Sequence, residues 1–391
     1  MIVTPLSDRA PAAIRDALLS HGWEGEVCRL TATGLDSSAF HVTGIEPAMI
    51  EAMLPVASRL GLEMVTGDDW LILTGARSRL GAFARPWVQP EAVRDLAQAI
   101  GMAMPAEPPE LWRHARGSLS LDVPLLIGIL NVTPDSFSDG GGVTDEASLL
   151  RRVEQLLSGG AGMIDVGGES TAPGAPVVEL SEELVRVIPA IRAIAREHAG
   201  LVISVDTVKH EVAEAALDAG AAIINDVTAG RHDPALLAVA AARGAGVVLS
   251  HSRGPVGRLA SYDDAEYDGD VAGGVTRELE GARQVALAAG VAMEAIVLDP
   301  GFGFGKRPDQ NIVLLDQVGA VVALGSPVLV GASRKRFIGE VSGRGLEDRD
   351  RATAAACALA LDRGARLFRV HDPEATRDAI AVAEALWQSR R

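Results

Sequence analysis

The sequence predicts an α/β protein: a (β/α)8 TIM barrel preceded by a small N-terminal α+β domain. Apolar runs of strand length alternate with Ala- and Leu-rich helical stretches over residues 124–388, which is the pattern of a parallel sheet covered by helices. Eight such units occur, and their span matches the ~250 residues that a closed eight-stranded barrel usually occupies. A doubly wound open sheet is the alternative, but eight regular units favour closure.

Each predicted strand is a short apolar run that ends in a polar or glycine-rich turn. The predicted strands are 125–131, 163–166, 202–206, 222–225, 246–250, 295–299, 327–330 and 366–370. The helices that follow them are predicted to begin near Asp145, Ser181, Lys209, Pro234, Asp264, Pro308, Asp350 and Pro373.

The first hundred residues follow a different pattern from the barrel. Two helices are predicted there, over residues 12–21 and 47–60. Three short strands are predicted over residues 26–31, 40–43 and 70–74. This mixture indicates a small α+β domain, and no group of residues of catalytic type occurs in it. A segment rich in proline and charge, 105–121, joins it to the barrel. We therefore expect an N-terminal extension over residues 1–115, whose role the sequence leaves open, and a catalytic barrel over residues 116–391.

Composition and charge exclude several classes of protein. Of 391 residues, 48% are hydrophobic and 23% charged, as in a globular protein rather than a disordered chain. The formal net charge of −16 argues against nucleic acid or an anionic membrane as a partner. Without a signal-peptide pattern or a long apolar stretch, we expect a cytoplasmic protein with no membrane span. Two isolated cysteines, Cys28 and Cys357, provide neither a disulfide framework nor a metal pair.

Polar side chains stand in or just after the last positions of the predicted strands. They are Asn131, Asp165, Asp206, Asn225, His251, Asp299, Ser333 and His371. Any one of them could be a helix cap or a turn residue. In a parallel barrel, however, all strands end on the same face, where the loops build the active site. So many polar strand ends are better explained by one concave polar site.

Seven motifs at these strand ends occur together along the chain. They are NVTPDSFSDGG at 131–141, DVGGEST at 165–171, SVDT at 204–207, IND at 224–226, LDPGFGFGK at 298–306, GASRK at 331–335 and RVHD at 369–372. Together they resemble the dihydropteroate synthases of folate biosynthesis over roughly residues 124–388. The resemblance implies a pterin-binding barrel with dihydropteroate synthase activity.

The motif GFGFGK does not fit a nucleotide-binding loop. A P-loop needs four residues between its glycines and Ser or Thr after the lysine, whereas Gly301 and Gly305 enclose three residues and Arg307 follows Lys306. A dinucleotide fingerprint needs a third glycine where Lys306 stands. The glycines more simply allow the backbone to turn closely past a flat ligand, whose face Phe304 would line.

Three polar residues could recognise the edge of a pterin. Asp206 and Asp299 supply carboxylate acceptors and Asn225 supplies an amide, which can pair with the amino group, ring N–H groups and carbonyl of that edge. The resemblance assigns these three residues, together with Phe304 and Lys335, to pterin binding.

The resemblance also implies where the other groups bind. The residues expected around the diphosphate of the pterin substrate are Asn131, Thr171, Arg369 and His371. The residues expected around 4-aminobenzoate are Phe137, Pro173 and Ser333. Asn131 would also bind Mg2+, the expected cofactor.

The implied reaction transfers a pterin methylene group from 6-hydroxymethyl-7,8-dihydropterin diphosphate to the amine of 4-aminobenzoate, giving 7,8-dihydropteroate and diphosphate. Magnesium and the cations would take up charge on the departing diphosphate. The resemblance implies catalytic roles for Asp206, Lys335 and Asp135. It further implies a transferase that is a homodimer and a sulfonamide target. No Ser-His-Asp triad or reactive cysteine suggests a covalent nucleophile.

The chain departs from the family pattern near the predicted site. Ala172 stands where the family commonly has Arg, and Ser250 and Ser252 flank His251 where the family usually has Met. These departures motivate one alternative, a non-catalytic pterin-binding paralogue. A second alternative is a pterin-dependent methyltransferase of related fold. The loop 131–141 argues against it, because diphosphate departure needs a metal loop and methyl transfer does not.

Overall fold

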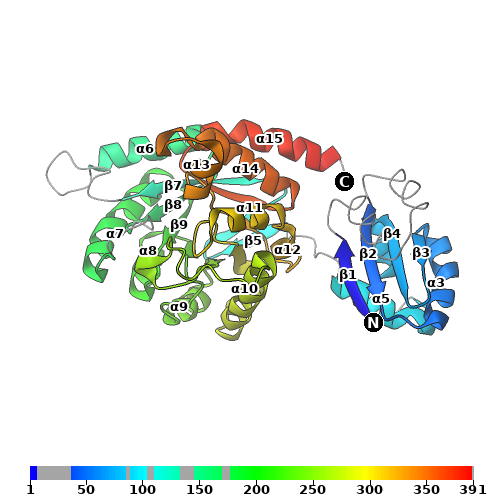
Figure 1. The fold of residues 1–391 in the computed structure, drawn as a ribbon. Coiled ribbons are helices and arrows are strands. Elements are labelled where there is room, and N and C mark those ends of the chain that lie inside the picture. The colour runs from blue at the N-terminus through cyan, green and yellow to red at the C-terminus, as the bar shows by residue number, and fades with distance from the viewer. Residues whose placement is uncertain (7–36, 85–88, 104–109, 133–144, 170–176, 390–391) are drawn as a thin grey trace. The chain divides into compact units, whose positions relative to one another are not determined.

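The computed structural model describes residues 1–6, 37–84, 89–103, 110–132, 145–169 and 177–389 (Figure 1). Contacts divide the chain into two compact units, Met1–Pro105 and Ala106–Ser389. Each unit buries an apolar core of its own. Among the described residues, no helix is both long and apolar enough to cross a membrane.

The described part of the first unit is an antiparallel sheet with helices, the α+β mixture that the sequence predicts. Its strand order is β1-β2-β4-β3. The strands are β1 (Ile2–Leu6), β2 (Ser37–Thr43), β3 (Glu63–Thr66) and β4 (Trp70–Ala76). The helices are α3 (Pro47–Leu60), α4 (Arg77–Phe83), the 3-10 helix η2 (Glu91–Val93) and α5 (Arg94–Ala103).

Helix α3 has the bounds expected from the sequence. It begins at Pro47, a residue favoured in the first helical turn, and ends at Gly61, whose φ of 63° is easiest for glycine. Strands β2 and β4 include the predicted strands 40–43 and 70–74. The predicted helix 12–21 and strand 26–31 lie outside the described residues. Strands β1 and β3 and helix α4 were not predicted, because each has seven residues or fewer and is too short to show a clear period. Helix α5 has ten residues and was also not predicted.

The second unit contains a barrel of eight parallel strands. In sheet order they are β12 (Ile296–Asp299), β11 (Gly246–Ser250), β10 (Ile223–Asp226), β9 (Val202–Asp206), β8 (Met163–Gly167), β7 (Leu125–Asn131), β14 (Leu367–Val370) and β13 (Leu329–Val330). A parallel bridge between Leu298 and Val328 joins the two ends of this order. The backbone N–H of Leu298 also donates to the carbonyl of Pro327 at 2.9 Å. The sheet therefore closes on itself, which confirms the predicted barrel.

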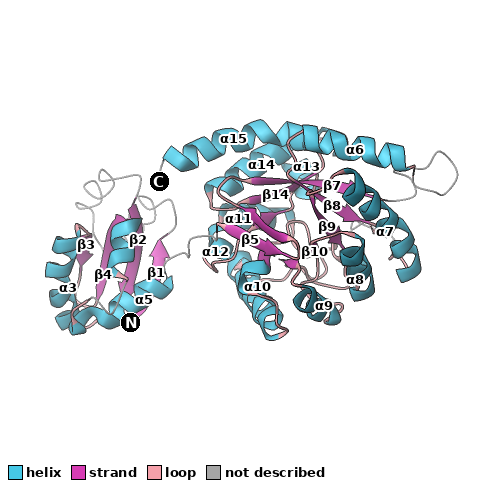
Figure 2. Ribbon diagram, turned by 180° about the vertical axis from the view of Figure 1, so that it is seen from behind, coloured by secondary structure: helices cyan, strands magenta, loops and turns pink. Residues whose placement is uncertain are grey.

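Helices surround the strands on the outside of the barrel (Figure 2). They are α6 (Glu146–Ser158), α7 (Leu180–Glu197), α8 (His210–Ala219), α9 (Ala235–Arg243), α10 (Val271–Ala288), α11 (Pro308–Asp316), α12 (Gly319–Val322), α13 (Arg336–Ser342), α14 (Asp350–Asp362) and α15 (Pro373–Ser389). Most begin at or beside the predicted residue. Helix α10 begins later than predicted, because the Asp270 side chain caps it by accepting from the Gly273 N–H at 2.8 Å.

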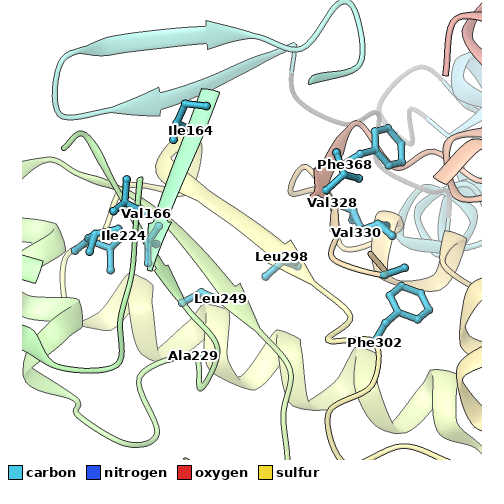
Figure 3. Close-up of a cluster of buried hydrophobic side chains, with 14 of the residues drawn as sticks. Ile164, Val166, Ile224, Ala229, Leu249, Leu298, Phe302, Val328, Val330 and Phe368 are labelled. Carbon is cyan, nitrogen blue, oxygen red and sulfur yellow. The ribbon is translucent and has the colours of Figure 1, made fainter. Parts of the chain in front are cut away.

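Side chains along the strands alternate between the two sides of the barrel wall. Ile164, Val166 and Leu249 belong to a large apolar cluster that the strands form with the surrounding helices (Figure 3). The neighbouring positions face inward. At the amino ends of the strands these inward residues form a second apolar cluster that includes Ile127, Met163, Ile223, Val248, Val297, Leu329 and Leu367. The inward positions toward the carboxyl ends are polar, so the barrel interior is apolar at one end and polar at the other.

A hairpin closes the amino end of the barrel. It consists of β5 (Leu111–His114) and β6 (Gly117–Ser120). Trp112 is fully buried in the inward apolar cluster, and its indole N–H donates to the Ala295 carbonyl at 3.0 Å. The domain boundary expected after residue 115 would cut through this hairpin. The contacts instead divide the chain at Pro105–Ala106, because Trp112 packs into the barrel.

Candidate active site

Nine of the residues expected in the site belong to the described part of the chain. They are Asn131, Asp206, Asn225, Asp299, Phe304, Ser333, Lys335, Arg369 and His371. All come from the carboxyl ends of the strands or the loops that follow them. Four further expected residues lie outside the described residues: Asp135, Phe137, Thr171 and Pro173. Ala172 lies outside them too.

Arg369 links the carboxylates of two neighbouring strands. Its Nε lies 2.5 Å from Asp165 Oδ2, and a terminal nitrogen lies 2.7 Å from Asp206 Oδ2. Asp165 also accepts hydrogen bonds from the Ser204 hydroxyl and, at 3.2 Å, from the Asn225 amide. Residues expected separately around the pterin and around the diphosphate therefore form one continuous network.

The two carboxylates expected to bind the pterin have raised pKa values. Burial raises the pKa of Asp206 to about 7, with Arg369 opposing the shift and Asp165 adding to it. Burial also raises the pKa of Asp299. Both oxygens of Asp299 are held in place, one by the Gly301 N–H at 2.8 Å and the other by the Ser250 hydroxyl at 3.1 Å. The Ser250 side chain thus orients Asp299 instead of supplying an apolar wall.

Lys335 lies over the face of Phe304, with its ammonium 3.6 Å from the ring centroid. Burial and repulsion from Arg369 lower the pKa of Lys335 to about 8, while Asp299 and Asp206 oppose that change. Among the described residues, no hydrogen-bond acceptor lies within bonding distance of its ammonium group. Lys335 is therefore a partly buried cation with its donors still available to a ligand.

The backbone conformation at Arg334 sets the directions in which the side chains of Ser333 and Lys335 leave the chain. Arg334 has a φ of 56°, which is unfavourable for a residue with a side chain. Its guanidinium holds Asp350 through two hydrogen bonds of 2.8 and 2.7 Å, and its N–H donates to the Thr353 hydroxyl at 3.1 Å. This anchoring to the start of α14 keeps the chain kinked between Ser333 and Lys335.

Ser333 and His371 form a pair at the ends of β13 and β14. The Ser333 oxygen accepts from the His371 backbone N–H at 3.1 Å and lies 2.9 Å from His371 Nδ1. Burial, together with Arg369 and Arg334, lowers the pKa of His371 to about 3. In the tautomer of the neutral ring whose hydrogen is on Nε2, Nδ1 accepts the hydroxyl proton and Nε2–H is left for a ligand. His371 can contact an anion as a hydrogen-bond donor but not as a cation.

The three glycines of the loop after β12 all have positive φ angles, of 68° at Gly301, 78° at Gly303 and 59° at Gly305. A Cβ atom at Gly301 would overlap the carbonyl oxygen of His251, and one at Gly303 would lie 3.0 Å from Lys335 Cδ. The glycines therefore let the loop pass close to the β11 end and to Lys335, without any nucleotide-binding role.

Asn131 is the residue that could hold a metal ion in the described part of the site. It is the last residue of β7, its side chain is exposed, and an amide oxygen is a ligand type that Mg2+ accepts. A Cβ atom built on Gly167 would lie 3.8 Å from Asn131 Oδ1 and 3.7 Å from Asp206 Oδ2. Oxygens from β7 and β9 thus lie near the same glycine, but Asp206 Oδ2 is already paired with Arg369 at 2.7 Å, which leaves the Asn131 amide oxygen as the one that could take a magnesium ion here.

Sequence reasoning gave no site role to several residues that the structure places in this network. They are Ser204, Ser250, Lys306 and Arg334, while Asp165 was expected only as one of the polar strand ends. The signal for Asp165, Ser204 and Ser250 was present in the alternation of the strands, since each lies at an inward position of its strand, as Asp206, Asn225 and Asp299 do. No local pattern distinguishes Lys306 or Arg334.

Comparison with known proteins identifies the family of the chain. A family model described as pterin binding enzyme matches residues 127–371. Dihydropteroate synthase from Streptococcus pyogenes is 46% identical over 263 residues, which cover 67% of this chain and 95% of that protein. Dihydropteroate synthase from Synechocystis is 43% identical over 264 residues, 67% of this chain and 90% of that protein.

The chain is also similar to solved structures of dihydropteroate synthases. Xanthomonas albilineans dihydropteroate synthase with 4-aminobenzoic acid has a TM-score of 0.65 and 45% identity, covering 71% of this chain and 98% of that one. The same enzyme in complex with 7,8-dihydropteroate has a TM-score of 0.61 and 42% identity, covering 70% and 98%. The chain therefore belongs to the pterin-binding enzyme family, in its dihydropteroate synthase branch.

Proposed function

We propose that this protein condenses 6-hydroxymethyl-7,8-dihydropterin diphosphate with 4-aminobenzoate to give 7,8-dihydropteroate and diphosphate. The observation that carries the proposal is the network at the carboxyl end of the barrel, where Arg369 pairs with Asp206 and Asp165, Asn225 donates to Asp165, and Lys335 interacts with the charges of Asp299 and Asp206. The dihydropteroate synthase relatives make an enzyme of the transferase class the expected type.

The pterin edge binds to the acceptors and donors at the ends of β9, β10 and β12. Asp206 and Asp299 accept from the amino and ring N–H groups, and the Asn225 amide pairs with the remaining polar atoms. The Lys335 ammonium lies over the Phe304 ring, so Phe304 borders the pterin site beneath Lys335, and the free donors of Lys335 reach the polar atoms of the pterin. Because these groups are buried, mismatched ligands leave unpaired donors or acceptors and bind poorly.

The diphosphate binds beside the pterin, toward β7 and β14. Arg369 keeps one terminal nitrogen free of partners among the described residues, and the His371 Nε2–H donates toward the same side. Asn131 holds Mg2+ through its amide oxygen, with Thr171 as a further phosphate contact. When bound, the magnesium ion supplies positive charge that stabilises the departing diphosphate.

The bond changes require positioning rather than covalent catalysis. The carbon–oxygen bond between the pterin methylene and diphosphate breaks, with the electron pair leaving on the diphosphate. The neutral amine of 4-aminobenzoate forms the new carbon–nitrogen bond and then loses a proton. Ser333, Phe137 and Pro173 hold 4-aminobenzoate, and Asp206, Lys335 and Asp135 are the proposed catalytic residues.

We also propose that the enzyme is cytoplasmic and forms a homodimer. Apolar side chains on the last two helices support the dimer, since Leu359 of α14 and Val382 and Leu386 of α15 are each about half or more exposed. Such a patch on adjacent helices is typical of an interface. Light scattering at several protein concentrations tests it, and a monomer at all of them contradicts it.

The test of the proposed function is diphosphate release from pterin diphosphate in the presence of Mg2+ and 4-aminobenzoate. The wild type should release diphosphate only when both substrates are present. Asp206→Asn and Asp299→Asn should lose most activity, because each replaces an acceptor oxygen with a donor that opposes the pterin N–H groups. Each substitution keeps the shape of the side chain, so the melting temperatures should not change. A protein that binds pterin without turnover would be the non-catalytic paralogue, and methyl transfer without diphosphate release would identify the methyltransferase.

A further inference from the structure

We propose that Lys306 is a positioning residue of the pterin site, whose ammonium group holds the 301–305 loop so that Phe304 lies against Lys335. The inference rests on the proposed function, because it concerns how that site binds its pterin. Lys306 contacts Phe304 only at its backbone carbonyl and bonds to no side chain expected to contact a substrate, so it acts through the loop.

The Lys306 ammonium is fully buried and is surrounded by three acceptors. Its nitrogen lies 2.9 Å from the Gly301 carbonyl, 3.0 Å from the Phe304 carbonyl and 2.9 Å from His251 Nδ1. An ammonium group has three N–H donors, so each acceptor receives one. The lysine therefore fixes both ends of the turn that carries Phe304.

His251 and Glu278 support the lysine from behind. The protonated Lys306 ammonium can only donate, so His251 Nδ1 accepts from it and His251 Nε2 carries the ring hydrogen. That nitrogen lies 3.1 Å from Glu278 Oε2 on α10. Burial lowers the pKa of His251 to about 4, which keeps the ring neutral as this arrangement requires. Arg253 also pairs with the Glu278 carboxylate and limits its movement.

The Phe304 ring packs with Val208, Val227 and Leu259, but this apolar cluster supplies no donor for the two carbonyls that Lys306 satisfies. Phe302 is fixed separately, because its ring stacks on Phe337 with 5.9 Å between centroids (Figure 3 shows Phe302). Without Lys306, the carbonyls of Gly301 and Phe304 would point into a buried space with no donor, and the turn would rearrange to satisfy them. Phe304 would then lose its contact with Lys335, and the pterin would lose one face of its site.

The choice of lysine is itself informative in this chain. Of its 36 basic residues other than histidine, 33 are arginine, and the three lysines are Lys209, Lys306 and Lys335. All three follow strands at the carboxyl end of the barrel. A compact ammonium can serve three acceptors around one point, whereas a planar guanidinium cannot. Lysine at position 306 thus matches the geometry of its three partners.

The first test is direct binding of 6-hydroxymethylpterin, followed by its fluorescence, to the full chain and to Lys306→Met. This variant keeps the side-chain length but removes the charge and all three donors. We expect the Kd to rise about tenfold, and the KM for pterin diphosphate to rise more than the KM for 4-aminobenzoate. A Kd within threefold of the wild type, or equal rises in both KM values, overturns the proposal.

Selective 13C labelling of lysine supplies a signature that a merely structural role would not change. Three lysines give three resolvable side-chain signals, and the ring current of Phe304 should shift the ε-methylene signal of Lys335 upfield. In Lys306→Met we expect this signal to move to an unshifted position. If it stays in place while the variant is folded, Lys306 does not position Phe304.

A second variant covers the case in which Lys306→Met does not fold. Glu278→Ala removes the half-exposed partner of His251 and should raise the pterin Kd about threefold. Its matched control is Glu214→Ala, a similarly exposed glutamate on α8 that pairs with Arg243 at 3.1 Å. Equal Kd values for these two variants overturn the proposal. Failure of the proposed function looks different, because the wild type itself would then show no diphosphate release.

Discussion

At the scale of single residues, the site combines ionisable groups that burial has moved toward neutral pH. Asp206 has its pKa raised to about 7, and Lys335 has its pKa lowered to about 8. Burial penalises the charged form of each, and their opposite charges partly restore it. Ligand binding at the site is therefore expected to depend on pH near neutrality, where ordinary surface carboxylates and lysines do not change their charge.

We predict that pterin affinity rises with pH up to about 7, levels off, and falls above about 8. The pterin N–H groups bind the Asp206 carboxylate, so protonation below its pKa competes with binding. The affinity should change about tenfold per pH unit on the acidic side, as expected for one linked proton. Above about 8, Lys335 loses its charge.

Fluorescence titrations of 6-hydroxymethylpterin between pH 5.5 and about 9 check this prediction. Burial lowers the pKa of Lys306 to about 7, so Lys306 titrates in the same range as Asp206. A variant is therefore needed to separate the effect of Asp206 from that of Lys306. Asp206→Asn should lose the acidic limb and keep the alkaline one. An unchanged acidic limb in that variant would contradict the assignment to Asp206.

A second residue-scale prediction concerns the kink at Arg334. Asp350→Ala removes the two hydrogen bonds that hold the Arg334 guanidinium and with it the strained positive φ of Arg334. Strain of ~1–3 kcal/mol at such a residue can then relax by reorienting Ser333 and Lys335. We expect kcat/KM to fall about tenfold, measured by diphosphate release. The control is Arg336→Ala, which removes a more exposed arginine nearby. Equal activities of the two variants would show that the kink needs no anchor.

At the scale of elements, strand alternation divides the barrel interior into an apolar end and a polar end. A strand with a period of two offers only two or three inward positions, and in this chain the first is apolar and the last polar. The hairpin of β5 and β6 covers the apolar end, while the loops at the other end build the site. Stability and function are thereby separated along the same strands.

We predict that Trp112→Ala destabilises the barrel by about 3–5 kcal/mol, the usual range for deleting a buried aromatic side chain. The substitution empties the centre of the inward apolar cluster and removes the hydrogen bond to Ala295. Urea unfolding of the wild type and the variant measures the difference. The exposed Leu111 provides the control, since Leu111→Ala should cost about 1 kcal/mol or less. Similar losses in both variants would contradict the role given to Trp112.

At the scale of the whole molecule, the chain is two units with separate cores. All described residues of the candidate site belong to the second unit, and the matched family model spans only residues 127–371. The first unit contributes no described residue to the site.

We predict that a chain beginning at Ala106 folds and keeps kcat/KM within about threefold of the full chain. It retains the β5–β6 hairpin and hence the Trp112 plug. A chain beginning at Arg116 lacks strand β5 and should be unstable. Circular dichroism melting and the diphosphate assay compare the three proteins. A folded but inactive Ala106 chain would show that the first unit takes part in catalysis or assembly.

The sequence by itself determined the order and bounds of most strands and helices, because hydrophobic period and capping residues act locally. It also determined which strand ends carry polar groups, and its motifs indicated the family. It could not place the boundary near residue 105, since the proline-rich segment 105–121 has the composition of a linker. Only the packing of Trp112 into the closed barrel assigns that hairpin.

Only the tertiary structure decided how the site residues act on one another. Arg369 and Asp165 are 204 residues apart in the sequence and meet because the barrel closes between the first and last strands. Lys306 likewise acquires its role from His251, which lies 55 residues earlier on the neighbouring strand. Pairings of this kind depend on strand order and register, which no local pattern encodes. The physical reason is that burial and partner geometry, not residue type, set the charge and direction of each group.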